Sequence, residues 1–275
     1  MESQCNRIYN ASFSEIQDEN STYSKILGCI QPGERVLDVG CATGFLGKYL
    51  HETKRADVVG LDYTSYHVQK SIESGGYSRV LQVNLNEPES LLNCDLGLFD
   101  KIVLLDVLEH LYDPQASLTF LCRFLKKDGM VLCSLPNVTH GSVKLKLLMN
   151  TFDYTDKGIM DASHIRFFTR KSSVDLFSKC NLSIVDLKYV ISNKFGSRKR
   201  LASMPLEVLQ YVKGSSDSYV FQFVFIAKKK GSNVDNSFFL KEPDVMHSIP
   251  IASHSSKERS RKWFFWLKKV IKSNG

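Results

Sequence analysis

Short apolar runs alternate with amphipathic segments along the first 230 residues of the chain. The apolar runs predict seven strands, at 36–39, 58–61, 80–86 including the strand exit, 99–105, 130–135, 182–190 and 219–227. The amphipathic segments predict helices at 21–30, 45–51, 66–74, 118–126, 143–149, 169–179 and 205–212. Strands that alternate with helices are typical of an α/β fold with a mostly parallel sheet. We therefore expect one α/β domain over residues 1–230.

The most informative stretch lies where the first apolar run ends in Asp38. The loop Gly40-Cys41-Ala42-Thr43-Gly44 follows, and a helix begins at Phe45. Glycines allow the positive φ angles of a tight loop, and the unpaired N–H groups of a helix start can hold a ligand. Such units bind either dinucleotides or S-adenosylmethionine. A dinucleotide fingerprint needs glycine where Ala42 and Phe45 stand here, so the pattern disfavours a pyrophosphate.

A second strand ends in an acid, Asp62, which is suited to accept the hydroxyls of a ribose. Together the two stretches resemble the class I S-adenosylmethionine-dependent methyltransferases. The resemblance implies a doubly wound, seven-stranded sheet in the order 3-2-1-4-5-7-6, with the last strand of the chain antiparallel. It also implies S-adenosylmethionine as cofactor and this binding set: Asp38, Gly40, Cys41, Ala42, Thr43, Gly44, Asp62, Tyr63, Asn84, Leu85, Leu105 and Asp106.

The resemblance gives these residues different parts of the cofactor. Asp38 and the loop 40–44 would hold the methionine end, and Asp62 would hold the ribose. The others would border these groups: Tyr63 beside the ribose, Asn84 and Leu85 beside the adenine, and Leu105 with a carbonyl toward the ammonium group. An ordinary turn residue is the alternative for Asn84.

The string D-V-L-E-H-L-x-D-P at 106–114 follows the fourth predicted strand and resembles the fourth motif of small-molecule methyltransferases. The carboxyl ends of the strands face the ligand crevice in such sheets, so we expect His110 near the transferred methyl group. His140 and His164 lie at a strand exit and in an insert, and they complete the catalytic candidates. His51 and His67 fall within predicted helices and are set aside.

Residues 142–168 exceed the minimal fold and predict a helical insert after the fifth strand. The motif from Pro136 to Thr169 resembles a bacterial branch of the family that is associated with sugar and polysaccharide biosynthesis, over about residues 30–230. Asp161 and Arg166 are candidates to bind sugar hydroxyls or a phosphate, and Tyr154 is a candidate to stack on a sugar ring. A purely structural lid is the alternative for this insert.

The charge distribution separates the end of the chain from its body. Of the net charge of +7, residues 257–275 carry +6, so the body is nearly neutral and we expect no nucleic-acid partner. The seven cysteines show no metal-binding spacing, which predicts free thiols in a reducing compartment and no metal site. No signal segment and no apolar run of 18 residues is present, so we expect a cytoplasmic protein.

The last part of the chain differs in character from the body. Residues 231–256 are rich in Ser and Asn and predict a flexible linker. Residues 257–275 are basic, with Trp263, Trp266, Leu267, Val270 and Ile271 on one face of a predicted helix. A basic amphipathic helix of this kind favours peripheral contact with the inner face of the cell membrane. Docking on its own body or on a partner is the alternative, and the oligomeric state stays open.

These patterns lead to one function and several alternatives. The leading hypothesis is O-methylation of a sugar, glycan or other small-molecule acceptor, with His164 or His110 as general base. Proximity of the acceptor to the methyl group, without a base, is the alternative mechanism. The alternative functions are a quinone- or lipid-type methyltransferase and a non-catalytic, methyltransferase-like scaffold.

Overall fold

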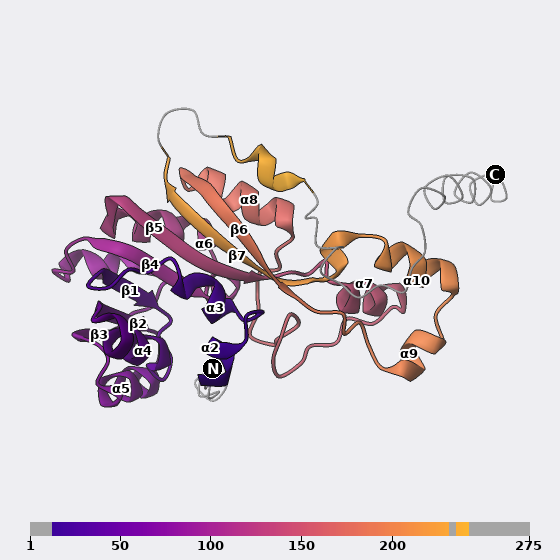
Figure 1. Cartoon of the computed structure of the whole chain (residues 1–275), viewed down its shortest axis with the longest axis horizontal. Coiled ribbons are helices and arrows are strands. Elements are labelled where there is room, and N and C mark those ends of the chain that lie inside the picture. The colour runs from indigo at the N-terminus through magenta and orange to yellow at the C-terminus, as the bar shows by residue number, and fades with distance from the viewer. Residues whose placement is uncertain (1–12, 231–234, 242–275) are drawn as a thin grey trace. The chain divides into compact units, whose positions relative to one another are not determined.

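The computed structural model describes residues 13–230 and 235–241, all within one compact unit, Met1–Pro243. A single sheet has the order β3-β2-β1-β4-β5-β7-β6, which confirms the predicted topology (Figure 1). Its strand β7 pairs antiparallel with β5 and β6, and the other neighbours pair in parallel. The strands are β1 (Arg35–Val39), β2 (Asp57–Asp62), β3 (Arg79–Gln82), β4 (Phe99–Leu105), β5 (Leu125–Pro136), β6 (Leu182–Ile191) and β7 (Val220–Lys229).

The central strands are buried on both faces, which explains their continuous apolar sequences. Val36 and Leu37 of β1 are fully buried, and Val39 pairs with Leu61 of β2 and Leu104 of β4. The carboxyl ends of these three strands therefore meet at one edge of the sheet. The segments that follow them, which carry most of the predicted cofactor residues, converge on that edge.

Helices cover both faces of the sheet (Figure 1). Helices α3 and α4 belong to a core cluster with Val224 and Ile226 of β7, whereas Phe177 of α8 stacks on Phe225 at 4.7 Å. Alternate residues of a strand point to opposite faces, so α8 lies on the other side of the sheet from α3 and α4. The α-helices are α2 (Phe13–Gln17), α3 (Thr22–Leu27), α4 (Phe45–Lys54), α5 (Ser65–Ser74), α6 (Pro114–Leu121), α7 (Gly141–Leu148), α8 (Arg170–Lys179), α9 (Arg198–Ala202) and α10 (Leu206–Lys213).

Helix α6 shows where local patterns predict well and where they fail. Asp113 caps its start by accepting a hydrogen bond from Ala116 N at 2.9 Å, with Pro114 in the first turn. The helix ends at Leu121, however, and β5 already begins at Leu125. The predicted helix 118–126 thus starts too late and runs past the observed end at Leu121, and the predicted strand 130–135 misses the first residues of β5. The reason is tertiary, because Leu125 is buried and pairs with Phe99 of β4.

The segment after β5 forms the expected insert, which consists of α7 and an irregular strap, residues 150–169. Ile159 and Met160 of the strap form a small apolar cluster with Val143 of α7. The N–H groups of Ile165 and Arg166 both donate to the Glu109 carbonyl oxygen at 3.0 Å. The strap is therefore anchored on the turn that follows β4.

The residues described after β7 correct part of the predicted linker. Asn236 is buried, and its side chain accepts a hydrogen bond from Ile184 N at 3.0 Å and donates to Leu182 O at 2.9 Å. Residues 235–241 therefore dock on β6 instead of forming a free linker. The predicted amphipathic helix at 257–275 lies outside the described residues. Within the described ranges, no helix has the length and apolar character needed to cross a bilayer.

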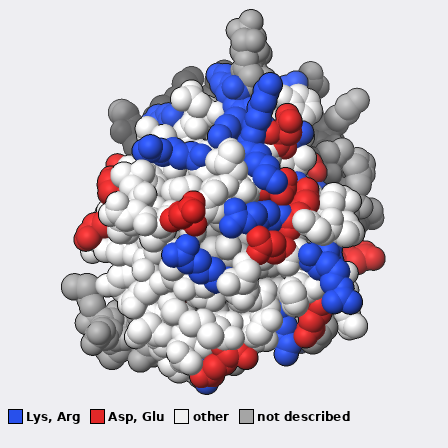
Figure 2. All heavy atoms as spheres, turned by 90° about the vertical axis from the view of Figure 1, so that its left-hand side faces the viewer, with Lys and Arg blue, Asp and Glu red and all other residues white. Residues whose placement is uncertain are grey.

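Basic and acidic side chains are intermixed on the face of the molecule shown in Figure 2. Ion pairs also join separate parts of the chain, such as Lys101 with Glu34 at 2.7 Å and Lys126 with Asp100 at 2.8 Å. This face therefore presents no field of a single sign. The cysteines among the described residues are free thiols.

Candidate active site

The loop after β1 has the backbone shape that its glycines predict. Gly40, Ala42 and Gly44 adopt positive φ angles of 74°, 48° and 87°. The N–H groups of Gly40 and Cys41 donate to the Leu61 carbonyl oxygen at 2.7 and 3.0 Å. These bonds hold the loop over the junction of β1 and β2. Ala42 adopts the left-handed conformation without being glycine, which costs it about 1 kcal/mol.

Asp62 closes this loop from the end of β2. Its Oδ2 accepts a hydrogen bond from Ala42 N at 2.9 Å, and its Oδ1 accepts one from Thr64 N at 3.0 Å. His67 Nδ1 lies 3.2 Å from the same Oδ1, so this helix residue, which the sequence analysis set aside, supports the acid. Thr64 Oγ1 also donates to Oδ1, at 3.3 Å. Each carboxylate oxygen has about two acceptor positions, so Oδ2, which accepts one hydrogen bond among the described residues, retains capacity for a ribose hydroxyl.

Asp38, at the end of β1, is almost completely buried. The Tyr77 hydroxyl donates to Asp38 Oδ2 at 2.6 Å and accepts a hydrogen bond from Gly47 N at 3.1 Å. A Cβ atom on Gly47 would lie 2.1 Å from the Tyr77 ring, so a glycine here makes room for the tyrosine. Burial raises the pKa of Asp38 to about 6, and the charge of Asp62 acts in the same direction. The carboxylate is therefore costly to ionise unless a cation approaches it.

The remaining loop residues pack the loop against α5. Cys41 is buried, and its Sγ lies 3.3 Å from Ser71 Oγ, which also donates to the Ala42 carbonyl oxygen at 2.8 Å. Burial raises the pKa of the Cys41 thiol, so the thiol is a packing group. Thr43 lies between these contacts and the start of α4.

The exit of β4 is fixed by Asp106, whose φ of 56° is unusual for a residue other than glycine. Its Oδ1 accepts hydrogen bonds from Ser134 Oγ, at 2.9 Å, and from Gln222 Nε2. Thr22 Oγ1 donates to Gln222 Oε1 at 2.6 Å. This network joins α3, β4, β5 and β7 at the edge where the predicted cofactor residues meet. Two members of this network, Ser134 and Gln222, carry no sequence motif that marks them as part of the site.

The residues predicted to border the nucleoside lie beside the same edge. Tyr63 is 57% exposed directly after Asp62, and Leu105 is half-buried at the end of β4. Asn84 Oδ1 accepts a hydrogen bond from Asn86 N at 3.1 Å, so Asn84 shapes the turn after β3, next to the buried Leu85. Contact of Asn84 or Leu85 with adenine stays a prediction.

Two of the three predicted catalytic histidines come together with an acid that the sequence analysis did not single out. The rings of His110 and His164 lie edge to face, with centroids 4.8 Å apart. Glu109 is 1% exposed, and its Oε1 lies 3.9 Å from His164 Nε2. Burial lowers the pKa of both histidines and raises that of Glu109 well above its usual range. We call Glu109, His110 and His164 the β4-exit cluster.

His140 has a structural role in this fold. It is 1% exposed and caps α7, with Nδ1 2.8 Å from Ser142 Oγ and Nε2 3.1 Å from the Ser192 carbonyl oxygen. Burial lowers its pKa to about 4. Because both ring nitrogens are engaged within the protein, the structure argues against the predicted role of His140 as a general base.

The predicted substrate residues of the strap differ in exposure. Asp161 is 2% exposed, and its Oδ1 accepts hydrogen bonds from Ser163 N at 2.8 Å and Ser163 Oγ at 2.6 Å. This burial argues against contact with a substrate and gives Asp161 a part in shaping the turn before His164. Arg166 is exposed and donates through Nε to the Tyr112 carbonyl oxygen at 3.1 Å. Tyr154 is 53% exposed and is accessible to a ligand.

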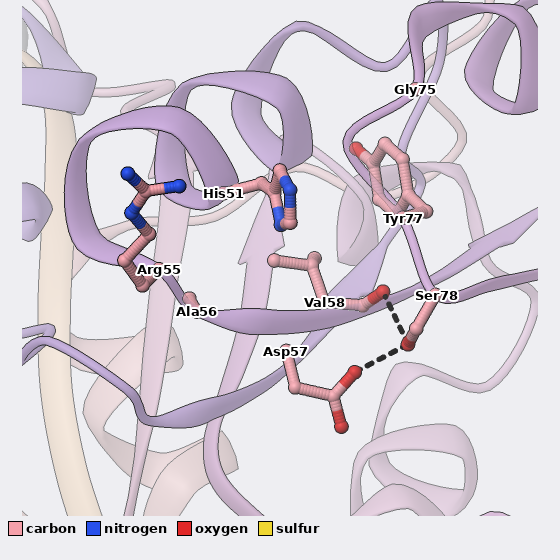
Figure 3. Close-up of a pocket in the computed structure, with 8 residues that line it drawn as sticks. All are labelled: His51, Arg55, Ala56, Asp57, Val58, Gly75, Tyr77 and Ser78. Atoms are coloured by element: carbon pink, nitrogen blue, oxygen red, sulfur yellow. Dashed lines mark hydrogen bonds between the residues drawn. The ribbon is translucent and has the colours of Figure 1, made fainter.

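A pocket of about 300 Å³ lies elsewhere, near the amino ends of β2 and β3 (Figure 3). Ser78 Oγ donates there to Asp57 and to the Val58 carbonyl oxygen, the latter at 3.2 Å. No residue predicted to bind the cofactor or the substrate lines this pocket. Its lining residues are His51, Arg55, Ala56, Asp57, Val58, Gly75, Tyr77 and Ser78.

The carboxyl edge of the sheet fits a nucleoside that carries a cationic amino-acid group. Asp38 is a buried acid that an ammonium group would stabilise, and Asp62 is an acceptor placed for ribose hydroxyls. Gly40 and Gly44 give the loop between them its positive φ angles, and the absence of a Cβ leaves room for Val107 beside Gly40 and for Ser71 and Ser74 beside Gly44. These residues match the needs of S-adenosylmethionine, whose bound form supplies an activated methyl group on a sulfonium centre.

Comparison with known sequences supports this interpretation. Residues 12–187 match the family described as methyltransferase domain. A ubiquinone biosynthesis O-methyltransferase of Dictyostelium discoideum, a mitochondrial protein, is 26% identical over 171 residues, which cover 58% of this chain and 53% of that protein. A ubiquinone biosynthesis O-methyltransferase of Cereibacter sphaeroides is 28% identical over 185 residues, which cover 66% of this chain and 73% of that protein. The chain thus spans about half the length of the Dictyostelium relative.

Solved structures agree on the fold. Magnesium protoporphyrin IX methyltransferase from Synechocystis, solved with bound SAH, has a TM-score of 0.54 at 18% identity and covers 83% of this chain and 94% of its own. An S-adenosylmethionine-dependent methyltransferase from Clostridium acetobutylicum has a TM-score of 0.52 at 15% identity. The match covers 81% of this chain and 94% of that protein. Since the family match extends over more than half of the sequence, the chain belongs to the methyltransferase domain family and is an S-adenosylmethionine-dependent methyltransferase.

Proposed function

We propose that the enzyme methylates a hydroxyl group of a quinone-type, phenolic acceptor. The observation that carries this proposal is that both relatives described above are named ubiquinone biosynthesis O-methyltransferases. The strap motif led the sequence analysis to favour a sugar or glycan acceptor. The relatives instead support the quinone-type alternative, and we adopt it here.

The chemistry of this reaction sets modest demands on the protein. The methyl group is already activated, and a neutral thioether leaves, so no acid is needed at the leaving group. The protein has to hold the acceptor oxygen in line behind the methyl group and to assist loss of the acceptor proton. A phenol has a pKa near 10, so a general base can remove its proton during the transfer at neutral pH.

The β4-exit cluster is the part of this chain that we assign to the acceptor proton. Glu109 and His110 follow β4, whose carboxyl end faces the ligand crevice in doubly wound sheets, and His164 joins them from the strap. His110 is half-buried, whereas His164 and Glu109 are buried. This arrangement would present one neutral imidazole to the acceptor and support it with two buried groups.

The cofactor would lie along the same edge. Asp38 and the loop 40–44 would hold its methionine end, and Asp62 would hold its ribose. Tyr63, Leu85 and Asn84 would border its nucleoside, and Leu105 and Asp106 would shape the passage from the cofactor to the β4-exit cluster. Binding of S-adenosylhomocysteine, measured by calorimetry on the full chain, tests this arrangement separately from the choice of acceptor.

A transfer assay identifies the acceptor. The full chain is incubated with methyl-labelled S-adenosylmethionine and, in separate reactions, a polyprenylated catechol, a nucleotide sugar or a glycolipid. Label on the catechol alone supports the proposal, whereas label on a sugar alone replaces it with the sugar hypothesis. Binding of S-adenosylhomocysteine without transfer to any acceptor class would favour a non-catalytic scaffold.

An apolar, quinone-type acceptor would be found at a membrane, and the basic residues 257–275 could bind there. We propose that residues 257–275 bring the enzyme to an anionic membrane surface, where each Lys or Arg contributes about 1 kcal/mol. The full chain should sediment together with vesicles that contain anionic lipids. A chain shortened after residue 256 should stay in the supernatant. Equal sedimentation of the two chains would argue for docking on the body or on a partner.

A further inference from the structure

We propose that Glu109, His110 and His164 form a binding site for a divalent transition-metal ion. Candidate ligand atoms of the three residues lie within 4.8 Å of one another, on two segments separated by more than 50 residues of sequence. Two imidazoles and one carboxylate are a ligand set that suits zinc, iron(II), cobalt(II) and manganese(II). No metal site was predicted from the sequence, because the cysteines and histidines show no metal-binding spacing.

The state of Glu109 is the first argument for a cation. The residue is 1% exposed, and neither carboxylate oxygen finds a hydrogen-bond partner among the described residues. Oε1 faces the ring of His164, with 3.9 Å between Oε1 and Nε2. A buried carboxylate without hydrogen bonds is costly, and coordination to a metal is one of the few ways to satisfy it.

The orientation of both histidines is the second, independent argument. His110 Nδ1 lies 3.1 Å from the Ser163 carbonyl oxygen, and His164 Nδ1 lies 3.0 Å from the Ile159 carbonyl oxygen. A carbonyl oxygen only accepts, so each Nδ1 carries the proton and each Nε2 keeps its lone pair. Metal-binding histidines are held in this way by a carbonyl or a carboxylate behind the ring.

The surrounding backbone holds the three ligands in one unit. Ile165 N and Arg166 N both donate to the Glu109 carbonyl oxygen at 3.0 Å, so the strap that carries His164 is fastened to the residue that supplies the carboxylate. Ligand atoms on one zinc-type ion lie roughly 3.4 Å apart, given bonds of about 2.1 Å. The three side chains therefore need to draw together by about 1 Å, and half-buried His110 is the one with most room to move.

Such an ion would refine the proposed function. Three protein ligands leave coordination positions open, as in catalytic metal sites. An acceptor hydroxyl in one open position would lose its proton more readily, because the cation stabilises the oxyanion. This consequence depends on the proposed O-methyl transfer, whereas the metal site itself depends only on the three residues.

Cobalt(II) binding to the full chain tests the proposal directly. The protein is treated with a chelator, dialysed and titrated with CoCl2, while visible absorption and heat are recorded. We expect one equivalent to bind and give the d–d absorption of a low-coordinate nitrogen and oxygen site. Glu109→Gln and, separately, His110→Asn should each weaken the affinity by roughly 10- to 100-fold or abolish it.

The matched control is His51→Ala, which removes an exposed histidine of α4 and should leave cobalt binding unchanged. Melting temperature and S-adenosylhomocysteine binding verify that each variant folds. Lack of cobalt binding, equal binding to the wild type and both site variants, or thiolate charge-transfer bands would overturn the proposal. In those cases Glu109 is a buried acid that stays protonated and neutral. Failure of every acceptor to react while cobalt still binds would refute the O-methyl transfer proposal and leave the metal site standing.

Discussion

Replacing Asp38 by Asn would remove a charge that the folded protein holds at a cost. Asp38 is 4% exposed, and burial raises its pKa to about 6, from 3.8 for an ordinary aspartate. Asn retains an oxygen that can accept the hydrogen bond from the Tyr77 hydroxyl, which lies 2.6 Å from Asp38 Oδ2. The substitution therefore imitates the protonated acid and leaves the packing of the Tyr77 ring unchanged.

The magnitude follows from the two pKa values. The difference between about 6 and 3.8 corresponds to about 3 kcal/mol, at 1.36 kcal/mol per pKa unit. The folded state binds this proton more tightly than the unfolded state, so stability falls as the pH rises from 3.8 through about 6. Asp38→Asn should therefore exceed the wild type in free energy of unfolding by about 3 kcal/mol at pH 7.5. The gain should be roughly half as large at pH 5 and small near pH 4.

Urea unfolding of both proteins at these three pH values, followed by circular dichroism, measures the difference. Asp57→Asn is the control of opposite sign, because hydrogen bonds from Ser78 and Arg35 outweigh burial and lower the pKa of Asp57. That variant should lose stability at pH 7.5. A gain for Asp38→Asn that does not change with pH, or a loss at pH 7.5, would refute the assignment of the cost to Asp38. Weaker binding of S-adenosylhomocysteine by Asp38→Asn would show that the charge serves the ligand.

Three further substitutions test separate parts of the site. Ala42→Gly should raise the free energy of unfolding by about 1 kcal/mol in urea titrations, because glycine adopts a φ of 48° without strain, and an unchanged or lower value would contradict this. Asp62→Ala should weaken S-adenosylhomocysteine binding by about 10- to 100-fold in calorimetry, through lost hydrogen bonds to a charged acceptor, and unchanged affinity would exclude Asp62 from the cofactor site. His140→Ala should lower the free energy of unfolding by about 1–3 kcal/mol, because it leaves both hydrogen-bond partners of the buried ring unpaired. Methyl transfer per folded molecule should stay unchanged. A selective loss of transfer would restore His140 as a catalytic candidate.

The loop after β1 is predictable from the sequence because its cause is local, whereas the strand order was implied by the resemblance to the methyltransferase family. An apolar run that ends in Asp38 and turns through glycines has few other conformations open to it, and Gly40 and Gly44 adopt the positive φ angles that the pattern predicts. The same reasoning failed at Leu125, where pairing with β4 decides the conformation of a segment that would otherwise continue a helix. It also failed at Asn236, whose hydrogen bonds to β6 hold a segment with the composition of a linker.

The roles of individual polar residues also divide into those that the local sequence indicates and those that only tertiary contacts reveal. By itself the sequence determined the α/β class, the acids at the ends of β1 and β2, and three histidines worth testing, since these depend on residue type and spacing. Only the tertiary structure separated His140, with both nitrogens engaged, from the pair His110 and His164. It alone placed Glu109 beside that pair and Tyr77 against Asp38. Such contacts join residues far apart in the sequence, and whether a buried acid has a partner depends on the packing of distant segments, which no local pattern records.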